Sequence, residues 1–189
     1  MHWVYLARDL GLVGVLTATF AGCGRPLTPP PGPASTPPPP QRVEASRENS
    51  TSHLDRAQPK LPVVKLWVGT KSIAAEVCRS VTEISTGLMF RPGIGPDEGM
   101  LFLFARPHQP AFYMKNVGFD IAVAYMDSDG VIQEIVHLKA QDITPVPAKA
   151  ANIQFVLETD PGWFQRNGIG PGMSVGTDHG TLKAAFKIP

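Results

Sequence analysis

Apolar and polar residues alternate over two neighbouring segments of the chain and predict a β-hairpin. Residues 64–68 place apolar side chains at every second position, and residues 73–77 repeat the pattern after the Gly69-Thr70 pair. A period of two is typical of strands with one buried face, and a glycine-containing pair between them is typical of a tight turn. The two segments therefore predict adjacent antiparallel strands.

Five later apolar segments predict further strands. They cover residues 100–104, 111–114, 121–126, 131–138 and 153–157. The first is an uninterrupted apolar run bounded by Gly99 and Pro107, which favours a strand buried on both faces. An Asp-Gly pair at Asp129-Gly130 separates the third segment from the fourth, and this is a strong signal for a second hairpin.

Two short helices are predicted from the residues at their ends. Ser80 and Glu83 have the spacing of a capping box ahead of apolar residues at helical spacing, which predicts a helix over residues 81–89. A second helix, of one to two turns, is bracketed by Asp160-Pro161 and Asn167-Gly168. Both helices are short beside the number of predicted strands.

This order of elements predicts a mainly β fold. We expect a compact single-domain barrel or half-barrel of about seven or more short strands with two short helices, because closure protects edge strands from pairing with other chains. The β-rich domain is expected over residues 62–189, a length close to that of a typical single domain.

The composition changes sharply before this domain. Of the 20 prolines in the 189-residue chain, 10 lie in residues 24–61, a segment without aromatic residues. Such a segment cannot bury enough apolar surface to offset its ordering entropy, so it predicts a disordered Pro-rich tether. The apolar run over residues 10–20 is too short to cross a bilayer and predicts an export signal peptide over residues 1–22.

The sequence Phe20-Ala21-Gly22-Cys23 resembles the bacterial lipobox. The resemblance implies cleavage before Cys23, lipidation of its thiol and anchoring to the membrane, with residues 23–61 as the lipidated cysteine and its tether. Glycine rather than aspartate at position 24, directly after the cysteine, resembles the signal that sorts lipoproteins to the outer membrane of a Gram-negative cell, facing the periplasm. The alternative is a secreted protein with a coincidental cysteine. Cys78, the only other cysteine, is interpreted as a small packed residue rather than a reactive thiol.

The charge distribution excludes one class of partner. The formal net charge is +1, and no basic cluster occurs after residue 61, so nucleic acid is not expected as a partner. We separately expect a monomer. No serine lies in a nucleophile-elbow pattern, and His108 and His137 have no nearby metal-ligand partner, so neither cofactor nor metal is predicted. A soft-metal site is the alternative, with the ligands Met89, Met100, Met114 and His108.

A series of short motifs follows a fixed order through the domain. They are Gly87-Leu88-Met89-Phe90-Arg91, Gly99-Met100-Leu101-Phe102, Phe112-Tyr113-Met114-Lys115-Asn116, Asp120, Leu157-Glu158, and Gly168, Gly172 and Gly176. The series resembles the domain of unknown function 192 family, small exported or lipoprotein domains of bacteria and archaea, over residues 63–177. Tyr113 and Val117 depart from the tryptophan and threonine usual there. The resemblance implies a compact β-rich fold in the cell envelope and supplies no reaction.

Polar residues that follow predicted elements form the candidate ligand site. The candidates are Arg91, Glu98, Lys115, Asn116 and Asp120. A guanidinium, an ammonium, an amide and carboxylates that meet at one end of a barrel would bind an anionic or sugar-like ligand. The alternative is a structural network in which Arg91 pairs with Asp120 or Glu158.

Two functions follow from these candidates. The first is a lipid-anchored binding or scaffolding module of the envelope, for an anionic small molecule or an envelope polymer. The alternative is a small hydrolase or lyase acting on envelope polymer, with Glu98 and Asp120 as its carboxylates. A binder should expose Arg91, Lys115 and Asn116 in a shallow cleft, whereas an enzyme should hold a carboxyl of raised pKa in a deep pocket. Whether the protein is an enzyme stays open at this point.

Overall fold

The computed structural model describes residues 52–188. The predicted signal peptide, Cys23 and the tether as far as residue 51 lie outside the described residues. None of the helices within residues 52–188 is long and apolar enough to cross a membrane.

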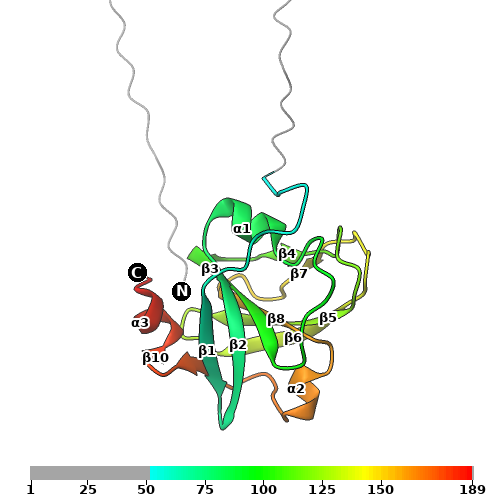
Figure 1. Ribbon diagram of the computed structural model, residues 1–189. Helices are drawn as coiled ribbons and strands as arrows, with labels where there is room; N and C mark the ends of the chain where they lie inside the picture. The colour runs from blue at the N-terminus through cyan, green and yellow to red at the C-terminus, as the bar shows by residue number, and fades with distance from the viewer. Residues whose placement is uncertain (1–51, 189) are drawn as a thin grey trace, which may run out of the picture. The chain divides into compact units, whose positions relative to one another are not determined.

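Eight strands form one twisted sheet, and two more form a small separate sheet (Figure 1). The large sheet has the order β10-β9-β1-β2-β3-β8-β5-β6 and is antiparallel except for the β2–β3 pair. Its strands are β1 (Val63–Val68), β2 (Lys71–Cys78), β3 (Glu98–His108), β5 (Ile121–Asp127), β6 (Ile132–Leu138), β8 (Ile153–Thr159), β9 (Val175–Thr177) and β10 (Gly180–Thr181). The small sheet pairs β4 (Ala111–Phe112) with β7 (Val146–Pro147).

The large sheet is an open half-barrel, one of the two forms that the sequence predicts. It does not close into a complete barrel. A bridge between Val131 and Ser174 joins the residues that precede β6 and β9, so the two edges of the sheet approach each other at one end. Both predicted hairpins are confirmed, with Val68 paired to Lys71 in the first and β5 paired to β6 in the second.

The two faces of the sheet carry separate hydrophobic cores. Along β3, Leu101 and Leu103 belong to one core, whereas Met100 and Phe102 belong to the other. This alternation explains why residues 100–104 read as one continuous apolar run, because both faces of a buried strand require apolar side chains. β8 lies between β3 and β5, and all seven of its residues are buried.

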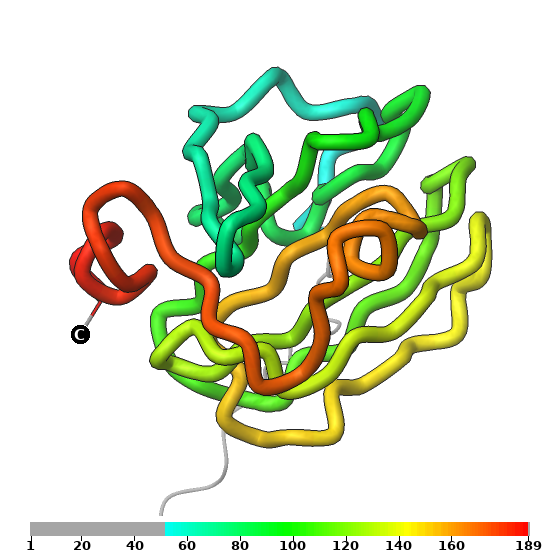
Figure 2. Tube along the Cα trace, turned by 90° about the horizontal axis from the view of Figure 1, so that it is seen from below, coloured from blue at the N-terminus to red at the C-terminus, as the bar shows by residue number. Residues whose placement is uncertain are grey.

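Three short helices cover the two faces. α1 (Val81–Thr86) lies on the face of the second core, next to β4 and β7 (Figure 1). α2 (Trp163–Arg166) and α3 (Leu182–Phe186) pack against the first core, and the view from below shows α2 over the sheet and α3 at its edge (Figure 2). The sequence predicts α2 but not α3.

The N-terminal end of α1 is as predicted, but its C-terminal end is not. The Ser80 hydroxyl accepts a hydrogen bond from the Glu83 amide, and the Glu83 carboxylate accepts one from the Ser80 amide, which completes the capping box. The helix was expected to continue to Met89, but Gly87 has a φ of +48° and ends it at Thr86. A positive φ is a conformation that glycine adopts readily.

Residues 52–61 lie against the domain and are called the strap below. The Gln58 side chain is 5% exposed, and its amide nitrogen donates to the carbonyls of Gly87 at 2.8 Å and Glu83 at 3.3 Å. The Leu54 amide donates to the Thr86 hydroxyl at 3.0 Å. The strap therefore crosses α1 and reaches the face of the second core, although composition alone assigns these residues to the tether.

Candidate functional site

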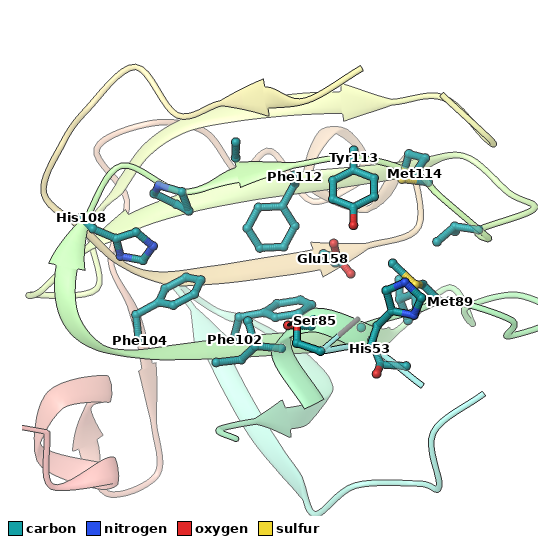
Figure 3. Close-up of a pocket in the computed structure, with 18 residues that line it drawn as sticks. His53, Ser85, Met89, Phe102, Phe104, His108, Phe112, Tyr113, Met114 and Glu158 are labelled. Carbon is teal, nitrogen blue, oxygen red and sulfur yellow. Dashed lines mark hydrogen bonds between the residues drawn. The ribbon is translucent and has the colours of Figure 1, made fainter. Parts of the chain in front are cut away.

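A pocket of about 290 Å³ opens on the face of the sheet that α1 and β4 cover (Figure 3). Its walls are mostly aromatic and apolar, and its rim includes two histidines. The side chains used in the following argument are Phe102, Phe104, Phe112, Tyr113, His53 and His108. β3 supplies Phe102, Phe104 and His108. Phe112 ends β4, Tyr113 follows it, and His53 belongs to the strap.

Glu158 lies inside this pocket, on the central strand β8. Its neighbours across the sheet are Met100 on β3 and Val123 on β5, both in the second core. Because side chains alternate along a strand, Glu158 faces the same side as Val156, opposite to Leu157 in the first core. Figure 3 shows its carboxyl between Phe112 and Tyr113 on one side and Phe102 and Ser85 on the other.

The surroundings of Glu158 favour the neutral acid. The residue is 5% exposed, and its Oε2 has no hydrogen-bond partner within residues 52–188. Burial raises the pKa of Glu158 to about 8 because removal from water penalises the charged form. At neutral pH the pocket therefore contains a protonated carboxyl with a free acceptor.

Two titratable groups near Glu158, Cys78 and Tyr125, are uncharged at neutral pH. Burial raises the pKa of Cys78 and Tyr125, and the negative charge on Glu158 raises both further. The Tyr125 hydroxyl donates to the Val146 carbonyl at 2.9 Å. Cys78 is completely buried, so it is a packed residue rather than a reactive thiol.

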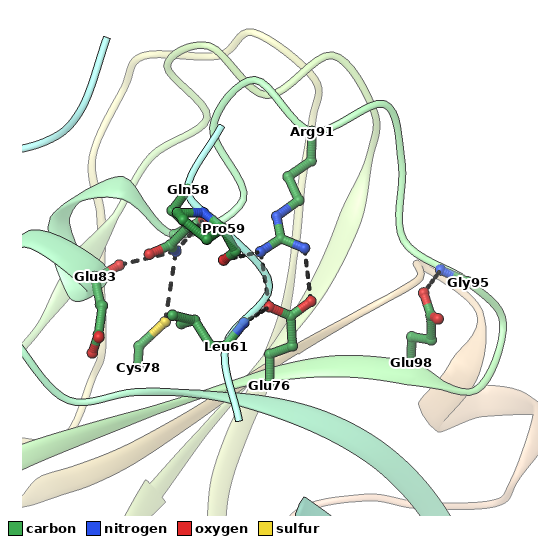
Figure 4. A network of polar contacts seen from close by, with 10 residues as sticks. Gln58, Pro59, Leu61, Glu76, Cys78, Glu83, Arg91, Gly95 and Glu98 are labelled. Carbon is green, nitrogen blue, oxygen red and sulfur yellow. Dashed lines mark hydrogen bonds and ion pairs between the residues drawn. The ribbon is translucent and has the colours of Figure 1, made fainter. Parts of the chain in front are cut away.

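The structure places Arg91 in an ion pair that the sequence did not predict. Its Nη1 and Nη2 donate to the two carboxylate oxygens of Glu76 on β2, at 2.7 and 2.8 Å (Figure 4). The side chains are 12% and 14% exposed. Glu76 also accepts a hydrogen bond from the Leu61 amide at 2.8 Å. The expected pairing of Arg91 with Asp120 or Glu158 is wrong, because Glu76 already occupies the guanidinium.

Asp120 has a different partner near the surface. Lys139 donates to it at 2.7 Å and the Ala140 amide at 2.9 Å. The hydrogen bond from Lys139, followed by that from Ala140, lowers the pKa of Asp120. Asp120 precedes β5 as predicted, but it does not line the pocket that contains Glu158.

Lys115 and Asn116 lie beside the rim of the pocket. Asn116 has a φ of +59°, and its carbonyl accepts a hydrogen bond from the Phe90 amide at 2.7 Å. Lys115 Nζ lies 3.4 Å from His53 Nε2. Both side chains are half-buried, and neither lines the pocket.

The five predicted residues therefore do not form one site. Glu98 begins β3 and accepts a hydrogen bond from the Gly95 amide at 3.0 Å. Glu98 and Arg91 border a second, smaller hollow of about 70 Å³, whereas Lys115 and Asn116 lie near the rim of the Glu158 pocket.

The predicted soft-metal ligands divide differently. Met89, Met114 and His108 line the Glu158 pocket, whereas Met100 is 1% exposed and belongs to the second core. Met89 and Met114 are also buried among apolar residues of this core. Packing thus accounts for all three methionines.

The sequence places Glu158 in a motif and among the possible partners of Arg91, but does not identify it as a site residue. Glu158 follows the apolar run over residues 153–157, where a polar residue normally indicates the exposed end of a strand. β8 instead continues to Thr159, which is completely buried. The available signal was the turn pair Asp160-Pro161, which places the strand end beyond Glu158.

Comparisons with known proteins agree with the fold. Residues 64–177 match the sequence profile of the domain of unknown function 192 family (DUF192), described as an uncharacterised ACR family. Among curated proteins, none matches the chain.

Two similar solved structures extend this comparison. A protein of unknown function from Novosphingobium aromaticivorans DSM 12444 is 33% identical, with a TM-score of 0.57 over 61% of this chain and 86% of that one. A proposed transcription regulator from Sinorhizobium meliloti 1021 is 23% identical, with a TM-score of 0.61 over 64% of this chain and 98% of that one. The second likeness shows the fold alone.

Proposed function

Since this chain belongs to the DUF192 family, which is described without an activity, we propose from the site itself that the protein is a lipid-anchored binding module of the bacterial envelope. Its pocket would hold a small, largely apolar ligand that has one polar group facing Glu158. The lipid anchor on Cys23 and the envelope location are part of the same proposal and rest on the lipobox-like sequence.

The observation that carries the binding function is the composition of the pocket. A cavity of about 290 Å³ lined by phenylalanine, methionine and leucine side chains contains one buried carboxyl. Small-molecule sites typically combine apolar walls with a few polar groups that orient the ligand, at volumes of roughly 300–1,000 Å³. The pocket lies at the lower end of this range, which favours a ligand of a few ring or chain atoms over a polymer.

The lining favours some ligands over others. No lysine or arginine is among the described residues that line the pocket. Of the two cations predicted for the site, Arg91 is paired with Glu76, and Lys115 lies near the rim of the pocket, close to His53. An anionic ligand, one of the two classes expected from the sequence, therefore has less support than a neutral or cationic one.

A hydrolase or lyase is the second candidate, and one observation favours it. A protonated Glu158 with a pKa raised to about 8 is able to donate a proton to a leaving group at neutral pH. However, the proposed carboxylate pair, Glu98 and Asp120, lies outside the pocket, and no second carboxylate occurs among the described lining residues. A single acid supports binding better than a reaction that requires an acid and a base.

Blocking the pocket is expected to abolish binding of a small neutral probe. Ser85 on α1 lines the pocket and is half-buried, so Ser85→Trp would place an indole in the cavity. We expect the affinity of the full-length protein for benzyl alcohol, measured by calorimetry, to fall at least tenfold. Val81→Trp is the matched control because Val81 is on the same helix and is 72% exposed. Equal binding by the two variants would contradict the pocket as the binding site.

Replacing Cys23 by serine is expected to release the protein from the membrane. The acylated thiol would be the only apolar anchor that remains after signal cleavage, and lipid chains provide that anchoring energy. Cys23→Ser should move the protein from the membrane pellet to the soluble fraction or leave it unprocessed. Cys78→Ser is the control, since Cys78 is buried in the domain. A processed Cys23→Ser protein that still sediments with membranes after a salt wash would show that the anchor is elsewhere.

A further inference from the structure

We propose that the Glu158 pocket selects a compact organic cation, namely an ammonium group on a small aromatic or aliphatic body. This inference rests on the proposed binding function and names the class of ligand. Three features of the pocket support it: a free acceptor, aromatic walls and, among the described lining residues, the absence of lysine and arginine.

The first feature is the unpartnered oxygen of Glu158. The residue is 5% exposed, and Oε2 accepts no hydrogen bond from any residue between 52 and 188. Its carboxyl points into the pocket (Figure 3). Buried polar atoms normally have partners, so a buried acceptor directed at a cavity indicates a donor on the ligand. An ammonium N–H group satisfies this acceptor and forms a charge-assisted hydrogen bond with it.

The second feature is the set of aromatic rings around the carboxyl. Phe102 and Phe112 meet edge to face, with ring centroids 5.1 Å apart, and Phe112 meets Tyr125 in the same way at 6.0 Å. Tyr113 lies on the same side as Phe112, with its hydroxyl directed towards Glu158 (Figure 3). A cation within about 6 Å of such ring faces is attracted by their quadrupoles, most strongly where water is excluded.

The third feature is the charge of the groups around Glu158. The titratable groups that line the pocket with Glu158 are His53, His108 and Tyr113, and those buried in the adjoining core are Cys78 on β2 and Tyr125 on β5. Cys78 and Tyr125 stay neutral at physiological pH because burial raises the pKa of both groups. Lys115 lies close to His53 near the rim, outside the lining. A carboxylate bound beside Glu158 would thus lack a lysine or arginine partner within the described lining.

Binding of an ammonium ion has a defined proton balance. The neutral carboxyl of Glu158 releases its proton to solvent, and the resulting carboxylate accepts a hydrogen bond from the ammonium nitrogen. No other bond forms or breaks. Because the pKa of Glu158 is raised to about 8, binding near pH 7 releases close to one proton. The affinity for the ammonium ion therefore increases with rising pH, by up to tenfold per pH unit, until the pH reaches that pKa.

Three probes of equal size test the proposal on the full-length protein. Benzylamine, benzyl alcohol and benzoate differ in charge but share one ring. We expect calorimetry at pH 7.5 to show that benzylamine binds at least tenfold more tightly than the other two. Titrations in two buffers of different ionisation enthalpy should give a release of about three quarters of a proton per benzylamine bound at this pH, because the pKa of Glu158 is raised to about 8, and none for benzyl alcohol.

The variant Glu158→Gln separates the possible failures. It keeps the shape of the side chain but removes its charge and its titration, so benzylamine should lose its tenfold advantage over benzyl alcohol and its proton release. Asp142→Asn is the control because Asp142 is exposed and outside the pocket. If benzyl alcohol or benzoate binds as tightly as benzylamine, the preference for a cation is overturned and the binding function stands. If none of the three binds, both proposals are overturned.

Discussion

The natural protein is expected to become less stable as the pH rises, and replacing Glu158 by glutamine is expected to abolish this pH dependence. The pKa of Glu158 in the folded protein is raised to about 8, whereas a glutamate in the unfolded chain titrates at about 4.3. Between these values the folded state binds a proton that the unfolded state has released. The free energy of unfolding therefore decreases with rising pH in this window.

The expected size of this effect is large for one side chain. The slope for one proton is about 1.4 kcal/mol per pH unit, so the stability present below about pH 4 decreases by a few kcal/mol before the curve flattens above about pH 8. Glutamine does not titrate, and the variant should lack this slope. The difference in the free energy of unfolding between Glu158→Gln and the natural protein should thus shift in favour of the variant when the pH is raised from 5 to 8.

Urea denaturation at several pH values between 5 and 9 measures this slope directly. The matched control is Glu98→Gln, the same substitution at an exposed carboxyl at the start of β3. It should preserve the pH dependence of the natural protein. Parallel curves for the natural protein and Glu158→Gln would mean that Glu158 is ionised in the fold, with a partner that compensates its charge.

Local patterns in the sequence were sufficient for most of the sheet. The hairpins β1–β2 and β5–β6 follow from alternation and turn residues, since both signals act between residues that are close in the chain. β7, β9 and β10 contain two or three residues each, which is too short to show a period. These strands form because a neighbouring strand has free backbone hydrogen-bonding groups at that place. The local sequence of such a short segment does not show that this partner is present.

The candidate site was harder to predict because it depends on contacts between distant segments. Arg91 and Glu76 are 15 residues apart, on a loop and on β2. Asp120 and Glu158 are carboxylates as well, so residue type alone does not identify Glu76 as the partner. The motifs did include Phe102, Phe112 and Glu158, but a motif does not show which side chains leave a space between them. That space depends on how α1, the strap and β4 pack over β8.

The second large effect is expected from the largely buried ion pair between Arg91 and Glu76, whose disruption should destabilise the fold. Burial raises the pKa of Glu76, but the hydrogen bonds from Arg91 and the Leu61 amide, together with the charge of Arg91, outweigh it and hold the pKa below its usual value. The carboxylate is thus ionised at neutral pH and depends on the guanidinium. The stability that the pair contributes is present above the usual glutamate pKa and is lost as the pH falls through the lowered one.

Removing both partners should cost less stability than the sum of the losses from removing each one alone. Arg91→Met leaves the Glu76 carboxylate with only the Leu61 amide, and we expect a loss of about 2–3 kcal/mol, below the range for completely buried pairs because both side chains keep some exposure. Glu76→Gln leaves the guanidinium uncompensated and should be comparably destabilising. The double variant Arg91→Met/Glu76→Gln should lose clearly less than the sum, since neither unpaired charge remains.

Urea denaturation of the two single variants and the double variant at pH 7 completes the cycle. The contrast is the pair of Lys139 and Asp120, whose side chains are 77% and 37% exposed. Exposed pairs are screened by water, so Asp120→Asn should change stability little. A coupling of more than about 0.5 kcal/mol between Arg91 and Glu76 is expected, because that value is the usual error of additivity for residues without contact. Additive losses within that error would mean that the strap and the Arg91 segment are held by apolar packing and by their remaining hydrogen bonds, such as those from Gln58.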